Sequence, residues 1–119
     1  MTKTFDIKVG GLLQVEKRIK GVGVFIAGAS AEAVRNTAID VNRLAKQFCP
    51  VDTGRLRSSI QLVDFNPKEP SAVVGTDVEY AEFVEYGTSR QSAQPYMRPA
   101  AEEGKHILKA EMEKELKGI

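Results

Sequence analysis

Residues 80–88 read Tyr-Ala-Glu-Phe-Val-Glu-Tyr-Gly-Thr and are the most informative stretch of this 119-residue chain. Just before them, Thr76 and Glu79 have the spacing of a capping box, in which a threonine and a glutamate each satisfy a free backbone N–H at the start of a helix. Gly87 follows, and glycine is the usual residue at the point where a helix stops. The stretch therefore predicts a short helix over residues 77–86 that ends at Gly87.

A second segment of this kind covers residues 50–60, which read Pro-Val-Asp-Thr-Gly-Arg-Leu-Arg-Ser-Ser-Ile. Asp52 or Thr53 can cap a single helical turn through Leu56, and Gly54 allows a tight chain reversal. The segment predicts a turn that projects two arginines, and it contains no recognisable catalytic set.

A third segment covers residues 94–100, which read Gln-Pro-Tyr-Met-Arg-Pro-Ala. Pro99 fits the first turn of a helix, where its missing N–H costs nothing. We expect a final helix over about residues 99–117, with an inner apolar stripe and a solvated charged face. Residues 88–94 are polar and predict a mobile loop between the two helices.

Upstream of these segments, residues 31–48 give the clearest helix pattern. Ser30 is a suitable N-cap, apolar residues recur at steps of three and four, and Pro50 ends the helix. Residues 59–65 and 71–76 then predict a β-hairpin around a proline-rich turn. These elements indicate an α+β fold, in which a small antiparallel sheet with its hairpin at about 59–76 packs against the helices at about 31–48 and 99–117.

The first thirty residues give the weakest pattern. Residues 5–9 suggest a short strand or an extended arm, and Leu12, Val15 and Ile19 have the spacing of a helix. The glycines that follow predict an irregular or bent connection, because each interior glycine weakens a helix by about 1 kcal/mol. At this length we expect residues 1–119 to form a single domain, with residues 1–30 as an N-terminal arm or helix.

Composition excludes several classes of protein. The net charge of +1 gives no strong field toward DNA or an anionic membrane, and the chain has one cysteine, too few for an internal disulfide or a cysteine-rich metal site. Cys49 fits a reducing cytosol, and residues 22–29 form too short an apolar run to span a membrane. We expect no membrane association and no cofactor.

Catalytic arrangements have simpler explanations at each position. Cys49 and His106 are a possible nucleophile and base, but their places in the pattern suggest a buried thiol and a solvated imidazole. The pairs Glu82/Glu85 and Glu102/Glu103 are typical of solvated helix faces. The chain is therefore predicted not to be an enzyme.

A nucleic-acid interface would depend on Arg55, Arg57, Arg90 and Arg98. Acidic residues lie between these arginines, which favours ion pairing within the chain over binding of phosphates. We hypothesise that Arg55 or Arg57 pairs with Glu85 and fixes the turn onto the short helix.

Three aromatic residues, Tyr80, Phe83 and Tyr86, lie within seven positions and cannot all point inward from one short helix. Two interpretations remain open. Either two of them belong to the core while the third covers the sheet, or at least one marks a contact between subunits, where aromatic residues and arginine are enriched.

In this order the three segments resemble a family of phage and prophage tail-completion, neck and head–tail joining proteins. Its members have a Pro-Val-x-Thr-Gly-x-Leu-(Arg/Lys)-x-Ser-Ile turn, then Tyr-Ala-x-x-Val-Glu-x-Gly-Thr, then Pro-(Phe/Tyr)-(Met/Leu)-Arg-Pro-Ala. The resemblance spans residues 31–118 and is weak before Ser30. The candidate turn and interface residues are Pro50, Thr53, Gly54, Arg55, Arg57, Tyr80, Glu85, Tyr86, Gly87, Thr88, Pro95, Tyr96, Arg98 and Pro99.

The resemblance implies a non-enzymatic virion-assembly protein, made in the host cytoplasm and incorporated into the virion. Copies would form a ring at the neck or tail top, contact other neck and tail proteins, and surround a channel through which DNA at most passes. As a separate hypothesis, we expect the polar loop at residues 88–94 to become ordered only on assembly. The alternative is a small prophage-encoded DNA-binding or regulatory protein.

Overall fold

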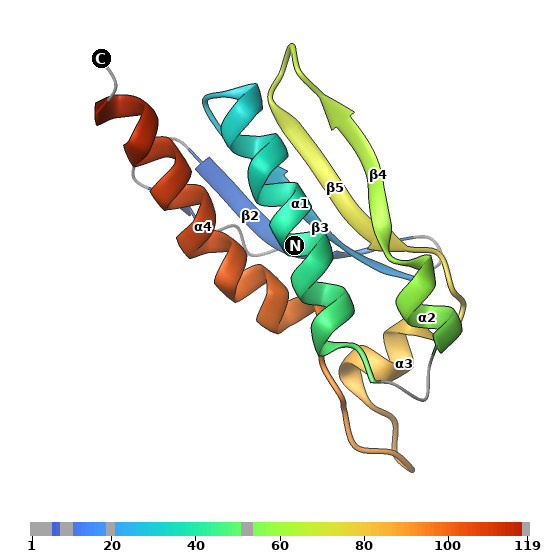
Figure 1. The fold of residues 1–119 in the computed structure, drawn as a ribbon. Helices are drawn as coiled ribbons and strands as arrows, with labels where there is room; N and C mark the ends of the chain where they lie inside the picture. Colours follow the sequence, from blue (N-terminus) through green and yellow to red (C-terminus); the bar gives the residue numbers. More distant parts are fainter. Residues whose placement is uncertain (1–5, 8–10, 19–20, 51–53, 118–119) are drawn as a thin grey trace.

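A computed structural model describes residues 6–7, 11–18, 21–50 and 54–117 (Figure 1). The elements run, in chain order, β1 (Asp6–Ile7), β2 (Gly11–Lys17), β3 (Val22–Ala27), α1 (Ala31–Phe48), α2 (Gly54–Ser59), β4 (Gln61–Asn66), β5 (Ser71–Thr76), α3 (Ala81–Tyr86) and α4 (Met97–Lys117). The fold is α+β, as predicted.

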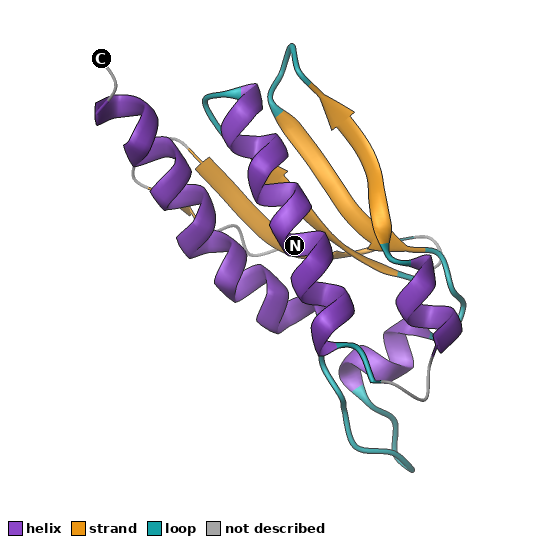
Figure 2. Cartoon of the chain, in the orientation of Figure 1, coloured by secondary structure: helices purple, strands orange, loops and turns teal. Residues whose placement is uncertain are grey.

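The strands form one antiparallel sheet in the order β1-β2-β3-β5-β4, so β4 lies at one edge. The long helices α1 and α4 pack side by side against one face of the sheet, with α4 over β2 and α1 over β5 (Figure 2). The short helices α2 and α3 lie at one end of this two-layer structure, together with the loop that leads into α4 (Figure 1).

The helix predicted over residues 31–48 is confirmed. The Ser30 side chain accepts a hydrogen bond from the Ala33 N–H at 3.2 Å, and the backbone becomes extended at Cys49, directly before Pro50. The hairpin is also confirmed. Asn66 Oδ1 accepts hydrogen bonds from the N–H groups of Lys68 and Glu69, which shapes the turn between β4 and β5.

The short strand suggested within residues 5–9 is present as β1, but the helix expected from Leu12 is wrong. Residues 11–17 and 22–27 pair as the strands β2 and β3, in place of a helix followed by an irregular connection. Leu13, Val24 and Ile26 follow a two-residue period toward the helices and are fully buried, and this burial outweighs the local helical spacing. The predicted helical position Ile19 lies outside the described residues.

A tight turn explains one of the glycines in this segment. Gly21 has a φ of 93°, and a Cβ atom at this position would lie 1.8 Å from the Thr76 carbonyl oxygen. Only glycine allows the turn to approach the end of β5 so closely.

The predicted capping box is also wrong. Helix α3 begins at Ala81 instead of residue 77, and its N-cap residue, Tyr80, makes no side-chain capping bond. Thr76 Oγ1 instead accepts a hydrogen bond from the Val78 N–H and contacts Ser59 Oγ at 2.6 Å, because Thr76 is the last residue of a buried strand. The final helix starts at Met97, two residues before the predicted start, and Pro99 lies in its first turn.

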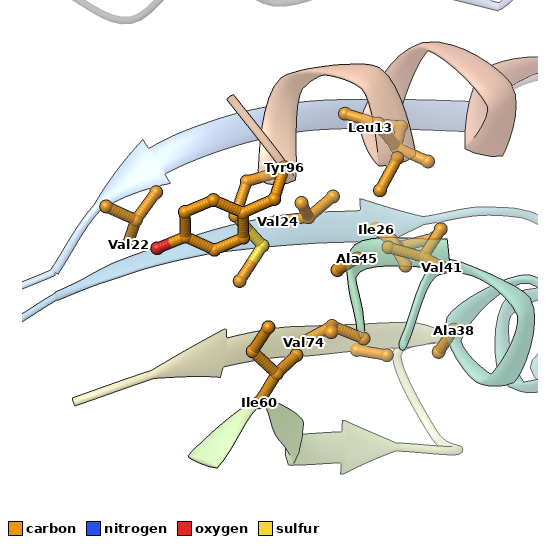
Figure 3. Close-up of a cluster of buried hydrophobic side chains, with 14 of the residues drawn as sticks. Leu13, Val22, Val24, Ile26, Ala38, Val41, Ala45, Ile60, Val74 and Tyr96 are labelled. Carbon is orange, nitrogen blue, oxygen red and sulfur yellow. The ribbon is translucent and has the colours of Figure 1, made fainter. Parts of the chain in front are cut away.

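The core lies between the sheet and the two long helices (Figure 3). Gly104 of α4 is buried where the helix faces α1 and β2, and a Cβ atom there would lie 2.7 Å from Val41 Cγ2 and 3.0 Å from Leu13 Cδ1. Figure 3 shows the Tyr96 side chain reaching into this core beside Val22 and Val24, with Ile60 and Val74 on the far side of the cluster. Tyr96 thereby connects the core to the end of the molecule that carries α2 and α3.

Candidate assembly surface

The three sequence segments come together at one end of the molecule (Figure 1). Arg55 in α2 bonds to Glu79 just before α3, and Glu85 in α3 bonds to the first residues of α4. The candidate residue Thr53 lies outside the described residues, and Pro50 is partly buried after α1. Segments that are separated by many residues in the sequence therefore build one continuous surface.

Glu85 is the centre of this end. Its side chain is fully buried, and Oε1 accepts hydrogen bonds from the backbone N–H groups of Tyr96 (3.1 Å) and Met97 (2.7 Å). Oε2 accepts from the backbone N–H and the Nε of Arg98, each at 3.2 Å. A carboxylate from α3 thus satisfies the free N–H groups at the start of α4 and lies at the positive end of its dipole.

Arg98 completes this connection. Its Nη2 donates to the Glu85 carbonyl oxygen at 3.3 Å, and its guanidinium lies 5.2 Å from the centre of the Tyr86 ring. The hypothesis that Arg55 or Arg57 pairs with Glu85 is therefore wrong, because the partner comes from α4. The reason is geometric: the loop folds back and places residue 98 beside residue 85, which sequence distance alone does not reveal.

The two arginines of α2 have other roles. Arg55 donates two hydrogen bonds to the Glu79 carboxylate, at 3.1 and 3.3 Å, and lies 5.7 Å from the centre of the Tyr80 ring. The hydrogen bond with Glu79 raises the pKa of Arg55. Arg57 Nε donates to the Lys46 carbonyl oxygen at 3.0 Å, which joins α2 to the last turn of α1.

Gly54 begins α2 and does not need the conformational freedom of glycine. It lies within a helix, and no atom of the described part of the chain lies within 4 Å of a Cβ atom built there. The predicted helical turn through Leu56 is present as α2, whereas the predicted cap at Asp52 or Thr53 and the chain reversal beside it lie outside the described residues. Gly87, in contrast, has a φ of 78° and ends α3 by donating its N–H to the Phe83 carbonyl oxygen at 2.8 Å.

The loop that follows Gly87 contains several internal hydrogen bonds. Thr88 Oγ1 accepts hydrogen bonds from the N–H groups of Arg90 and Gln91, and the Thr88 N–H donates to the Gln91 carbonyl oxygen. The Gln94 N–H returns to the Val84 carbonyl oxygen at 2.8 Å. These bonds close the loop on itself and deliver Pro95 and Tyr96 to α4.

The aromatic residues divide between core and surface. Phe83 is 54 % exposed and Tyr86 is 47 % exposed, whereas Tyr80 packs partly against the core. Tyr96 is fully buried and donates its hydroxyl to the Ala81 carbonyl oxygen at 3.1 Å. Burial raises the pKa of Tyr96 well above the usual value for a phenol. Of the three clustered aromatics, Phe83 and Tyr86 therefore remain about half exposed, so the interpretation that places two of the three in the core is wrong.

The residues considered for chemistry are arranged as follows. Cys49 is buried at the end of α1, whereas His106 is exposed on α4. Glu85 is bound by backbone donors, and Glu102 pairs with Lys105 at 3.1 Å. Among the described residues, no group of His, Cys, Asp and Glu is arranged to hold a metal ion.

The sequence pattern identified Glu85 and Arg98 separately but missed that they bind each other. The sequence feature that could have revealed this contact was a glutamate near the end of one short helix, followed by an arginine in the first turn of the next helix. The sequence pattern also missed the hairpin β2–β3, which supplies about half of the sheet.

Of the described helices, none combines the length and hydrophobicity needed to cross a membrane.

Comparison with known proteins gives one match. The family model HK97-gp10_like, described as "Bacteriophage HK97-gp10, putative tail-component", matches residues 14–87 and so includes the segment 50–60 and all but the last residue of the segment 80–88. No curated protein and no solved structure matches the chain. The match covers more than half of the 119 residues, starts within β2 and ends at the glycine that stops α3. The chain therefore belongs to the HK97-gp10-like family of bacteriophage tail components.

Proposed function

We propose that this protein is a structural component of the phage neck or tail top, where copies assemble into a ring that completes the tail for attachment to the head. Membership of a tail-component family places it in the virion, in company with other tail proteins. We propose in addition that the protein assembles in the host cytoplasm and has no enzymatic role.

The proposal depends mainly on the end of the molecule formed by α2, α3 and the start of α4, where internal bonds hold a surface with exposed aromatic rings. Its polar groups are used to join backbone segments, as in the bonds from Glu85 to residues 96–98. Phe83 and Tyr86 remain exposed on a surface held by these bonds. A surface that is held by internal bonds and exposes two aromatic rings suits contact with another protein.

Two further features support a ring. The edge strand β4 leaves one side of its backbone without a neighbouring strand among the described residues, and Leu62 and Val63 on it are about two-fifths exposed, at 40 % and 39 %. The net charge of +1 allows DNA to pass a channel of such subunits without strong attraction.

Electron microscopy of particles made without this protein tests the proposal. If it joins tails to heads, filled heads and finished tails will accumulate separately, and supplying the wild-type protein will restore joined virions. Normal infectious virions in its absence would overturn the proposed function.

A further inference from the structure

The loop between α3 and α4 extends beyond α2 and α3 at the end of the molecule (Figure 1). We call residues 88–95 the projecting loop, and each of them is exposed. Both ends of the loop are held, because the Gly87 N–H donates to the Phe83 carbonyl oxygen and Glu85 binds residues 96–98. The projecting loop is therefore a surface that the core of the fold does not use.

The hydrogen bonds that shape the projecting loop use its backbone and one hydroxyl group. Thr88 Oγ1 accepts from the N–H groups of Arg90 and Gln91, each at 3.1 Å, and the Gln94 N–H donates to the Val84 carbonyl oxygen at 2.8 Å. Within the described part of the chain, the other polar side chains of the loop have no hydrogen bond or ion pair. They are Ser89, Arg90, Gln91, Ser92 and Gln94. Their donors are therefore available to a ligand.

The projecting loop has a positive charge and lies in a segment without negative charge. Residues 86–101 contain Arg90 and Arg98 but no aspartate or glutamate. The flanking carboxylates in the sequence are already bound, Glu85 by Arg98 at 3.2 Å and Glu102 by Lys105 at 3.1 Å. Arg90 can therefore bind an anion from another molecule without first breaking an ion pair.

Arg90 differs in this respect from the other arginines considered for a nucleic-acid interface. Arg55 bonds to Glu79, Arg57 bonds to the Lys46 carbonyl oxygen, and Arg98 bonds to Glu85. These three guanidinium groups hold parts of the fold together. Of the four candidates, Arg90 is the one whose side chain has no partner among the described residues.

The composition of the projecting loop favours DNA over a protein as the source of the anion. Arginine, serine and glutamine side chains are typical donors to DNA phosphates. The loop contains no aromatic residue, and its aliphatic residues are only Ala93 and Pro95. Contacts between proteins usually depend on larger apolar anchors, which in this chain lie on α3.

We propose that the projecting loop contacts the phosphates of the DNA that passes through the ring, by means of Arg90 and its neighbouring serine and glutamine side chains. The inference rests on the proposed function, since the ring brings several copies of the loop around one duplex. One cation per copy gives weak contacts, and phosphates are alike at every base pair. DNA can therefore slide past the loop whatever its sequence.

Binding to a labelled DNA duplex, measured by fluorescence anisotropy, tests this contact in the full-length protein at concentrations where it forms rings. At about 50 mM salt we expect Arg90→Ala to weaken binding by at least about fivefold, and to lower the slope of log affinity against log salt by about one. Arg90→Lys keeps the positive charge and should keep the slope. Arg35→Ala is the matched control, because Arg35 is also exposed without an acidic partner among the described residues. Its affinity should stay within about twofold of the wild type.

The outcomes separate this inference from the proposed function. Equal losses for Arg90→Ala and Arg35→Ala would show that net charge attracts the DNA and that the loop has no special role. Wild-type rings that bind no DNA at low salt, or an Arg90→Ala protein that is folded by circular dichroism but does not assemble, would also overturn the inference. In each of these cases the role in joining heads to tails stands. An affinity that changes with DNA sequence would contradict a phosphate contact. Normal virions in the absence of the protein would refute the proposed function, and the role of the loop in a channel with it.

Discussion

At the scale of single residues, the most consequential group is the buried carboxylate of Glu85. It accepts four hydrogen bonds, three of them from backbone N–H groups at the start of α4. A buried acceptor of this kind does more for stability than an exposed ion pair, because its removal leaves several donors without partners away from water.

Replacement of Glu85 should therefore be costly. We expect Glu85→Ala to lower the free energy of unfolding by about 3–5 kcal/mol, and Arg98→Ala by about 1–3 kcal/mol, because Arg98 is half exposed and leaves the backbone donors satisfied. Urea denaturation measures both values. Glu82→Ala, in the same short helix, is the control and should change stability by about 0.5 kcal/mol or less. Equal losses for Glu85→Ala and Glu82→Ala would contradict the role assigned to Glu85.

Tyr96 predicts a dependence of stability on pH. Its pKa is raised in the folded protein, mainly by burial, above the value of about 10 for an unfolded tyrosine. The folded state then holds the phenol proton more tightly, so this contribution to stability is complete below about pH 10 and is lost as the pH rises above it.

The variant Tyr96→Phe isolates this effect. At neutral pH it should cost about 0.5–1.5 kcal/mol through loss of the bond to the Ala81 carbonyl oxygen. Above pH 10 its stability should fall less steeply than that of the wild type, as measured by thermal unfolding at a series of pH values. Burial also raises the pKa of Tyr86, but Tyr86 is present in both proteins and cancels in the comparison. Parallel pH profiles would refute the assignment to Tyr96.

At the scale of elements, the packing of α4 against α1 depends on a missing side chain. Helix propensity alone favours alanine over glycine by about 1 kcal/mol at an interior position. At Gly104 the added Cβ would meet side-chain atoms of Val41 on α1 and Leu13 on β2 at 2.7 and 3.0 Å, so the packing around it must shift to accommodate it. Close packing therefore outweighs propensity at this crossing.

We expect Gly104→Ala to destabilise the protein by about 1–2 kcal/mol, as overpacking exceeds the gain in helix propensity. Gly54→Ala is the matched control, because the same change in α2 meets no atom of the described residues within 4 Å. It should leave stability unchanged or raise it by up to about 1 kcal/mol. Calorimetric melting temperatures of the two variants test the comparison, and a stabilised Gly104→Ala protein would show that α1 and α4 pack less closely than described.

At the scale of the whole molecule, several large apolar side chains are exposed instead of packing in the core. Ile39, Leu62 and Phe83 are among them. Such residues add little to the stability of a monomer, whereas buried ones add much. The protein therefore divides its apolar surface between holding the fold and, as we propose, holding neighbouring copies.

Two substitutions distinguish apolar residues that stabilise the fold from those that we propose contact neighbouring copies. Phe83→Ser should change the free energy of unfolding by about 1 kcal/mol or less while weakening self-association, since its ring is 54 % exposed. Leu108→Ala, at a fully buried position of α4, should cost about 2–5 kcal/mol. Denaturation of the monomer and chromatography of the oligomer give the two readouts, and strong destabilisation by Phe83→Ser would place this ring in the core after all.

Local sequence signals predicted much of the fold. Helix α1 followed from its N-cap at Ser30, its apolar stripe and the break at Pro50, and the hairpin β4–β5 followed from its turn residues. These signals act within a few residues and survive in the folded state because tertiary contacts agree with them. The α+β class and the tail-component family were likewise accessible from the sequence.

The remaining features depended on contacts between distant residues. Segment 11–27 has helical spacing but becomes a hairpin, because strand pairing with β5 buries Val24 and Ile26 in a way that a helix there would not. Glu85 binds the start of α4 instead of Arg55 or Arg57, because the loop returns the chain to α3. By itself the sequence determined which short segments form turns, caps and helices. Only the tertiary structure decided which charges meet and which aromatics stay exposed, since both depend on distances across the fold.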